Sequence, residues 1–248
     1  GVKRLSEINL VLAGLLCLFV IVTGSVVATL SGFFTNTVDY LRYLPALSNW
    51  VGREDLDFFH GWTTFYWAWW IGWSPFVGMF IARVSRGRSV REFIFCALLV
   101  PSLACILWMT AFGGAATEQY LSTGVTSVVD AVKNFNVEMS LFKFLENLPY
   151  ASFFSGLSIV LIIIFFVTSM DSGSLVIDSI TAGGKLQVPV PQRVFWCCFE
   201  GLIAIALLLG GGLASLQALV LTVAFPFTIL IVLMCYCIYK GLKSEPLP

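Results

Sequence analysis

Long apolar stretches without charge constrain this chain more than any other feature of its sequence. Residues 8–38 contain no charged side chain, and about 20 apolar residues are enough for a helix to cross a bilayer. Charged residues make up only 11% of the 248 residues, against about 25% in ordinary soluble domains. The sequence therefore predicts an all-α integral membrane protein that forms a single membrane domain over residues 1–248.

Hydropathy separates six candidate spans, two of which are preceded by amphipathic segments. The amphipathic segments, 34–57 and 125–148, place apolar residues at helical spacing opposite charged ones, a pattern typical of helices that lie in the membrane interface. We expect both to lie on the external side. The six spans are predicted at 8–33, 58–81, 93–116, 153–181, 194–213 and 216–239.

Basic residues predict the orientation, because short cytoplasmic loops carry an excess of Lys and Arg. With the N-terminus inside, only Arg42, Arg53, Lys133 and Lys143 lie outside, and both chain ends are cytoplasmic. The remaining basic residues, on the cytoplasmic side, are Lys3, Arg4, Arg83, Arg86, Arg88, Arg91, Lys185, Arg193, Lys240 and Lys243.

Several classes of function are disfavoured by composition and motifs. A net charge of zero removes the basic excess that a nucleic-acid binder carries. An enzyme is also disfavoured, because there is no His/Asp/Ser constellation, metal-ligand spacing or glycine-rich phosphate loop. No cofactor is expected, and the seven cysteines fall inside apolar stretches as small packing residues. Gly1 in place of Met leaves two alternatives open, removal of Met or an incomplete chain.

Tryptophans crowd the second predicted span, where five of the eight fall between residues 62 and 73. At about 100° per residue, Tyr66, Trp69, Trp70 and Trp73 share one side of a helix. An interfacial aromatic belt explains Trp62 but not Trp70 and Trp73, which lie about 12 to 16 Å deeper. Exposed ring faces attract quaternary ammonium ions. The residues alone leave an aromatic cage and aromatic packing equally open.

Hydroxyl side chains and one acid interrupt the apolar fourth span. Phe165, Thr168, Ser169 and Ser172 share a face by their spacing, and a hard cation takes oxygen ligands. The more economical interpretation, however, is that these hydroxyls donate hydrogen bonds to the carbonyl four residues earlier in their own helix. Asp171 is a functional candidate because acids within spans are costly; gating or capping of a helix break is preferred over direct ion ligation.

The run Gly61-Trp62-Thr63-Thr64-Phe65-Tyr66-Trp67-Ala68-Trp69-Trp70 resembles the signature of the betaine/choline/carnitine transporter (BCCT) family. That signature reads Gly-Trp-Thr-aliphatic-x-aromatic-Trp-x-Trp-Trp, and only Thr64 departs from it. The continuation through residue 92 is most similar to the sodium-coupled glycine betaine symporters of the family. Further likeness is found at 113–116, 168–174 and 193–196.

The resemblance implies a LeuT-type inverted-repeat fold of about twelve spans, of which this chain supplies roughly the last six. Residues 1–57 then hold the last helix of the first repeat and an external amphipathic helix, and residues 58–248 hold the second five-helix repeat. We therefore expect an incomplete chain whose remaining site residues lie on earlier helices. Family likeness also implies a homotrimer.

The resemblance also assigns site residues. Trp70 matches a wall of the substrate's aromatic box, and Trp69, Trp73 and Tyr66 follow along the substrate path. Sodium ligands are implied at Thr168 and Ser169, with the carbonyl of Phe165, and at Phe76 for a second sodium position. Asp171 is retained as a gating candidate.

The implied function is sodium-driven symport of a betaine- or choline-like quaternary ammonium solute for osmoprotection. The expected location is the inner, or plasma, membrane, in contact with lipids. Alternatives are a sodium-independent exchanger or a proton-coupled choline/carnitine carrier of the same family. A solute-binding channel or osmosensor is an alternative of a different class.

Overall fold

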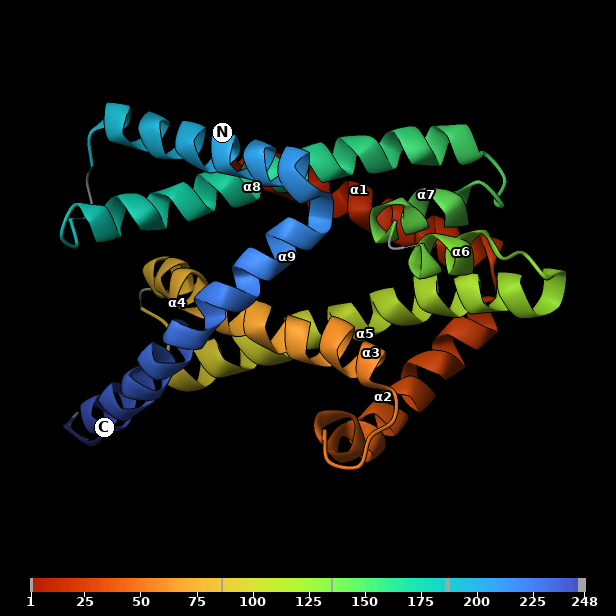
Figure 1. The fold of residues 1–248 in the computed structure, drawn as a ribbon, viewed down its shortest axis with the longest axis horizontal. Coiled ribbons are helices and arrows are strands. Elements are labelled where there is room, and N and C mark those ends of the chain that lie inside the picture. The colour runs from red at the N-terminus through yellow and green to blue at the C-terminus, as the bar shows by residue number, and fades with distance from the viewer. Residues whose placement is uncertain (1, 86, 135, 186–187, 245–248) are drawn as a thin grey trace. The chain divides into compact units, whose positions relative to one another are not determined.

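A computed structural model describes residues 2–85, 87–134, 136–185 and 188–244. All regular secondary structure in these ranges is helical (Figure 1), which confirms the predicted all-α class. The chain divides into two compact units, Gly1–Leu44 with Gly87–Ser169, and Pro45–Arg86 with Met170–Pro248. Arg86, one of the predicted cytoplasmic basic residues, lies outside the described ranges.

The first unit packs around a small apolar core in which α1 and α5 lie against each other. It contains most of α2 and the first part of α8 as well. Its helices are α1 (Val2–Thr23), α2 (Val26–Ser48), α5 (Val90–Thr123), α6 (Ser127–Lys133), α7 (Ser140–Leu145) and α8 (Ala151–Thr181).

The first predicted span ends earlier than expected. A helix over 8–33 followed by an amphipathic helix over 34–57 is wrong, because the chain breaks at Gly24 and Ser25 and α2 begins at Val26. The Ser25 hydroxyl accepts a hydrogen bond from the Ala28 amide at 3.2 Å. A serine in this position satisfies an otherwise unpaired amide at a helix start, so the cap outweighs the uninterrupted apolar character of the run.

The connection at 125–148 is also not one interfacial helix. It forms α6, a 3₁₀ turn η2 (Val137–Met139) and α7. Phe144 and Leu145 of α7 are buried in one cluster with Leu16, Val20 and Leu161. The apolar face that was expected to lie on lipid instead covers the core of the first unit, because neighbouring helices offer it a closer-packed partner.

The second unit is built on the packing of α4 against α9. Three consecutive helical segments, α3, η1 and α4, contain the aromatic-rich run. The last part of α8 also belongs to this unit. The segments are α3 (Leu56–Phe58), the π-helix η1 (Phe59–Thr64), α4 (Phe65–Val84) and α9 (Val190–Ser244).

Arg53 organises the turn that leads into η1. Its guanidinium donates to the carbonyl oxygens of Ala46 (3.2 Å) and Leu47 (3.1 Å) at the end of α2. It also forms a two-point ion pair with Asp55, with Nη2 and Oδ2 2.8 Å apart. This hydrogen bond lowers the pKa of Asp55 and raises the pKa of Arg53. The guanidinium lies 5.6 Å from the centre of the Phe59 ring, a cation–π contact that fixes the start of the π-helix.

A kink divides α9 into two helices. Its 55 residues have a length of about 80 Å at 1.5 Å per residue, whereas the hydrocarbon core is about 30 Å thick. Gly211 and Gly212 leave the helical conformation, and Gly212 has φ 64° and ψ −151°, a region open to glycine. The kink lies beside the predicted division between spans 194–213 and 216–239.

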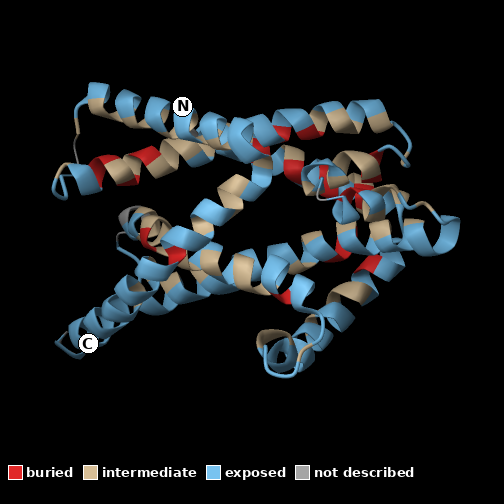
Figure 2. Cartoon of the chain, in the orientation of Figure 1, coloured by how far each residue is buried: buried red, intermediate tan, exposed pale blue. Residues whose placement is uncertain are grey.

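Within the described ranges, four helices are long and apolar enough to cross a membrane, namely α1 from Lys3, α5, α8 and α9. The aromatic-rich α4 is not among them, so the count of six spans stays a prediction. Much of the chain is coloured as exposed in Figure 2. The exposed residues include many large apolar ones, among them Leu209 at 85% and Phe225 at 78%. Such exposure suits contact with lipid or with further helices, and the chain is a multi-pass membrane protein.

Candidate functional site

The aromatic side chains of α4 form an exposed stripe. Tyr66, Trp69, Trp70 and Trp73 have exposed fractions between 37% and 56%, and all four lie in regular helix. They are therefore not core residues of the described chain. Their ring faces are open to a ligand or to a neighbouring segment.

The rings of this stripe contact one another in pairs. The ring centres of Tyr66 and Trp69 are 5.6 Å apart, and those of Trp70 and Trp73 are 5.5 Å apart with their planes at 67°. Trp62 stacks on Tyr66 with ring centres 6.0 Å apart. Aromatic pairs at these separations stabilise each other, so each ring holds the orientation of the next.

Packing against α9 fixes the neighbouring face of α4. A Cβ added at Gly72 would lie 3.9 Å from the Cα of Ala224, which shows how closely the two helices approach there. Phe76 packs its ring against Phe227, with ring centres 5.8 Å apart. The ring of this predicted sodium-site residue is thus engaged in helix packing. The only oxygen that Phe76 can offer is its main-chain carbonyl.

Thr168 makes the hydrogen bond within its own helix that the sequence favoured over ion ligation. Its hydroxyl donates to the carbonyl oxygens of Ile164 (2.9 Å) and Phe165 (3.1 Å). A threonine oxygen has two lone pairs besides its proton. Adjacent oxygens about 3 Å apart can both reach one hard cation at about 2.3 to 2.6 Å. The structure thus brings Thr168 and Phe165 together, with Ser169 exposed one residue further on.

Asp171 does not cap a helix break, because α8 runs without interruption from Ala151 to Thr181. It lies half-buried within the helix, and its carbonyl accepts the Ser174 hydroxyl at 3.2 Å. Its proposed gating role stays a prediction. The second sodium position predicted at Phe76 also stays a prediction.

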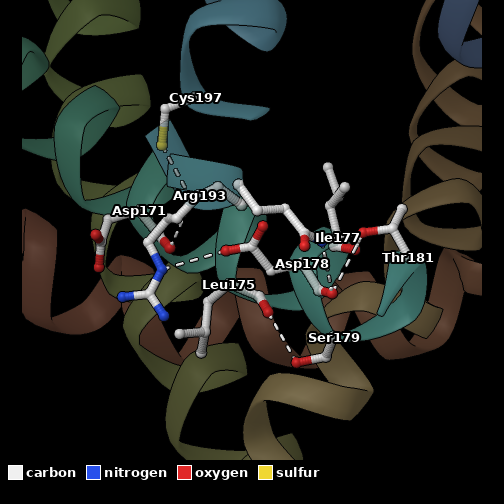
Figure 3. Close-up of polar contacts among 10 residues, drawn as sticks. Asp171, Leu175, Ile177, Asp178, Ser179, Thr181, Arg193 and Cys197 are labelled. Atoms are coloured by element: carbon white, nitrogen blue, oxygen red, sulfur yellow. Dashed lines mark hydrogen bonds and ion pairs between the residues drawn. The ribbon is translucent and has the colours of Figure 1, made fainter. Parts of the chain in front are cut away.

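An ion pair that was not predicted from the sequence joins the end of α8 to the start of α9. Arg193 Nε lies 3.2 Å from Asp178 Oδ2 (Figure 3), and Asp178 is only 1% exposed. Asp178 lies in the same apolar run as Asp171, and its position within a predicted span is the signal that could have marked it as a candidate. Three further hydrogen bonds join the same segments. Cys197 Sγ donates to Ser174 Oγ at 3.2 Å, and Gln192 Nε2 donates to Thr181 Oγ1 at 2.9 Å and to the Asp178 carbonyl oxygen at 3.5 Å.

Apolar helices of membrane-spanning length define a helical integral membrane protein. A profile of the betaine/carnitine/choline family of transporters matches residues 1–247. The chain belongs to this family, as the signature at 61–70 indicates.

Three relatives illustrate the similarity. A glycine betaine/proline/choline transporter of Vibrio parahaemolyticus is 57% identical over 246 residues, which are 99% of this chain and 44% of the relative. A glycine betaine/proline/choline/ectoine transporter of the same organism is 49% identical, with 99% and 44% covered. A glycine betaine transporter of Acinetobacter baylyi is 45% identical, with 99% and 37% covered.

The chain spans less than half the length of these relatives. Each is named as a transporter and none as an enzyme, in agreement with the prediction that this chain is not an enzyme.

Proposed function

We propose that this chain forms part of a secondary transporter that carries a betaine- or choline-like quaternary ammonium solute into the cell together with sodium. The observation that carries the proposal is the exposed aromatic stripe Tyr66, Trp69, Trp70 and Trp73. A quaternary ammonium has no N–H to donate and is held chiefly by ring faces. The relatives named as glycine betaine and choline transporters support this choice of substrate.

The energy available from such a stripe matches the task of a carrier. Each cation–π contact contributes about 0.5 to 2 kcal/mol, so three rings contribute several kcal/mol. After the costs of association, binding in the micromolar to millimolar range follows. A carrier must release its substrate, and this range permits release.

Sodium coupling is supported by the oxygens of Phe165 and Thr168. A sodium ion that moves down about 100 mV releases about 2.3 kcal/mol, which corresponds to roughly fifty-fold accumulation of solute per ion. Ser169 completes this proposed site, Phe76 is proposed for a second sodium position, and Asp171 is proposed to act in gating. Sodium serves here as the coupling ion and is transported with the substrate.

We further propose that the chain is the C-terminal half of a LeuT-type carrier of about twelve spans. In this arrangement both ends of the chain are cytoplasmic, the carrier is a homotrimer in the inner membrane, and its role is osmoprotection. This chain covers less than half of each relative's length, which supports the proposal that it is one half of a longer carrier. The remaining walls of the aromatic box would come from the preceding helices.

Proteoliposomes that contain the full-length transporter test the function. With labelled glycine betaine outside and an inward sodium gradient, we expect accumulation above the external concentration. Uptake that ignores sodium but follows a proton gradient, or that requires internal substrate, would contradict sodium symport. Equilibration without accumulation would identify a channel.

Removal of the Thr168 hydroxyl tests the sodium ligands. Thr168→Ala is expected to raise the sodium concentration for half-maximal uptake about tenfold or more, because a ligand to a charged group contributes about 1.5 to 3 kcal/mol. Thr222→Ala is the matched control, since Thr222 makes the same bond to the carbonyl four residues earlier at 2.8 Å. An equal shift in both variants would reduce the Thr168 effect to helix packing.

A further inference from the structure

Arg53 lies in the short connection between α2 and α3, yet only 12% of its side chain is exposed. Its Nη1 donates to the carbonyl oxygens of Ala46 and Leu47 in the last turn of α2, where carbonyls lack partners within the helix. Its Nε and Nη2 donate to the carboxylate of Asp55, the residue that precedes α3. One side chain thus joins the end of α2 to the start of α3.

The same guanidinium contacts the residues at which α3 passes into the π-helix η1. It lies 5.6 Å from the ring centres of both Phe58 and Phe59. A planar guanidinium can stack on rings with its faces while its edge donates hydrogen bonds. Phe58 is 46% exposed and Phe59 only 8%, so Arg53 meets the π-helix at a residue that is turned inward.

The π-helix sets how Phe59 and Trp62 point relative to each other. Hydrogen bonds in a π-helix join residues five apart rather than four, so each residue turns by less than the about 100° of an α-helix. The three steps from Phe59 to Trp62 therefore turn by less than about 300° and separate the two side chains further around the axis. Phe59 can then be buried beside Arg53 while Trp62, which is 39% exposed, reaches the aromatic stripe.

Trp62 connects this turn to the stripe. Its ring lies 6.0 Å from that of Tyr66, with only 10° between the two planes, and Tyr66 in turn contacts Trp69. Turns of π-helix are rare and occur often at functional sites. A return of η1 to the commoner α-helix would rotate Trp62 relative to Tyr66, so the contacts that hold η1 also hold this ring pair.

We propose that Arg53 is a positioning residue for substrate binding. By holding the start of η1, it holds Trp62 against Tyr66 and so fixes the N-terminal end of the aromatic stripe. The proposal rests on the proposed role of the stripe in binding a quaternary ammonium solute. It assigns to Arg53 an effect on substrate affinity without contact between Arg53 and the substrate.

Arg53→Gln in the full-length transporter is expected to raise the KM for glycine betaine about 2- to 10-fold, the equivalent of one aromatic pair. The maximal rate per folded transporter is expected to stay unchanged. Arg53→Lys keeps the charge beside Asp55 but not the fork of donors, and it is expected to raise KM less. Arg42→Gln is the matched control, because Arg42 also lies 5.6 Å from a ring, that of its neighbour Tyr43 in α2. It is expected to leave KM unchanged.

A double variant separates positioning from general support of the fold. Trp62→Leu removes the ring through which Arg53 is proposed to act. When Trp62 is already leucine, Arg53→Gln is therefore expected to change KM by less than about twofold. If Arg53→Gln raises KM as much in the Trp62→Leu background as in the unaltered transporter, or lowers only the maximal rate, the proposal is overturned.

Fluorine NMR of the full-length transporter labelled with 5-fluorotryptophan tests the positioning without substrate. Trp62→Phe and Trp108→Phe identify two resonances. Arg53→Gln is expected to shift that of Trp62 and to leave that of Trp108, which stacks on Phe112 in the first unit. An unmoved Trp62 resonance would overturn the proposal. A shifted Trp62 resonance together with an unchanged KM in Trp70→Leu would instead overturn the substrate role of the stripe, so the two failures are distinguishable.

Discussion

Replacing Trp70 by leucine in the full-length transporter is expected to lower the apparent affinity for glycine betaine by about 5- to 150-fold. Leucine keeps an apolar side chain of helical preference but removes the ring quadrupole, which contributes about 1 to 3 kcal/mol where water is excluded. Trp70 is 56% exposed, so the described packing loses little. The KM of sodium-driven uptake measures the effect.

Two further variants separate ring chemistry from general damage. Trp70→Phe retains a ring face and is expected to keep more of the affinity than Trp70→Leu. Trp50→Leu changes a tryptophan that is 67% exposed and lies outside α4, and it is expected to leave KM unchanged. If Trp70→Leu also leaves KM unchanged while the protein is present at normal levels, the stripe is packing surface and not a substrate wall.

The aromatic face of α4 was predictable because it depends only on the spacing of residues along a single helix. Residues 66, 69, 70 and 73 follow the helical period, and one regular helix places them side by side. The kink of α9 was predictable for the same reason, since the run at 210–212 is three glycines and glycine is costly inside a helix. Both features depend on neighbours within a few residues.

Other features depend on competition between local signals. The run from residue 8 to residue 33 is uncharged and mostly apolar, and hydropathy alone does not divide it. Gly24 and Ser25 contain the division, because a glycine followed by a capping serine favours a helix end and a new start. Hydropathy and capping disagreed at this point, and the cap prevailed.

Features that depend on distant partners could not be obtained from spacing at all. The period of 125–148 indicates an apolar face, but only the fold shows that Phe144 and Leu145 cover Leu16 and Leu161 rather than lipid. Asp178 and Arg193 are likewise joined by the approach of two helices.

The Asp178–Arg193 pair leads to the largest stability effect that we expect. Asp178 is 1% exposed; Arg193 contacts its Oδ2, and its Oδ1 has no hydrogen-bond partner in the described ranges. Arg193, with 39% of its side chain exposed, still reaches water. Arg193→Met keeps the length of the side chain but leaves a buried carboxylate without its counter-charge, which is expected to cost about 3 to 5 kcal/mol. A clear fall in the melting temperature of the full-length transporter in detergent measures this loss.

Asp178 is buried and Arg193 is partly exposed, so the two partners are expected to respond differently to substitution. Asp178→Asn is expected to cost less than Arg193→Met, because the arginine left behind can be hydrated, and the double variant is expected to recover part of the loss of Arg193→Met. Arg88→Met breaks the pair with Glu92, which is 3.6 Å long and about half exposed at both ends, and is expected to cost about 0 to 1 kcal/mol. Equal melting temperatures for Arg193→Met and Arg88→Met would show that Asp178 is solvated in the assembled transporter. A large difference, partly reversed in the double variant, would establish that this pair holds the end of α8 to the start of α9.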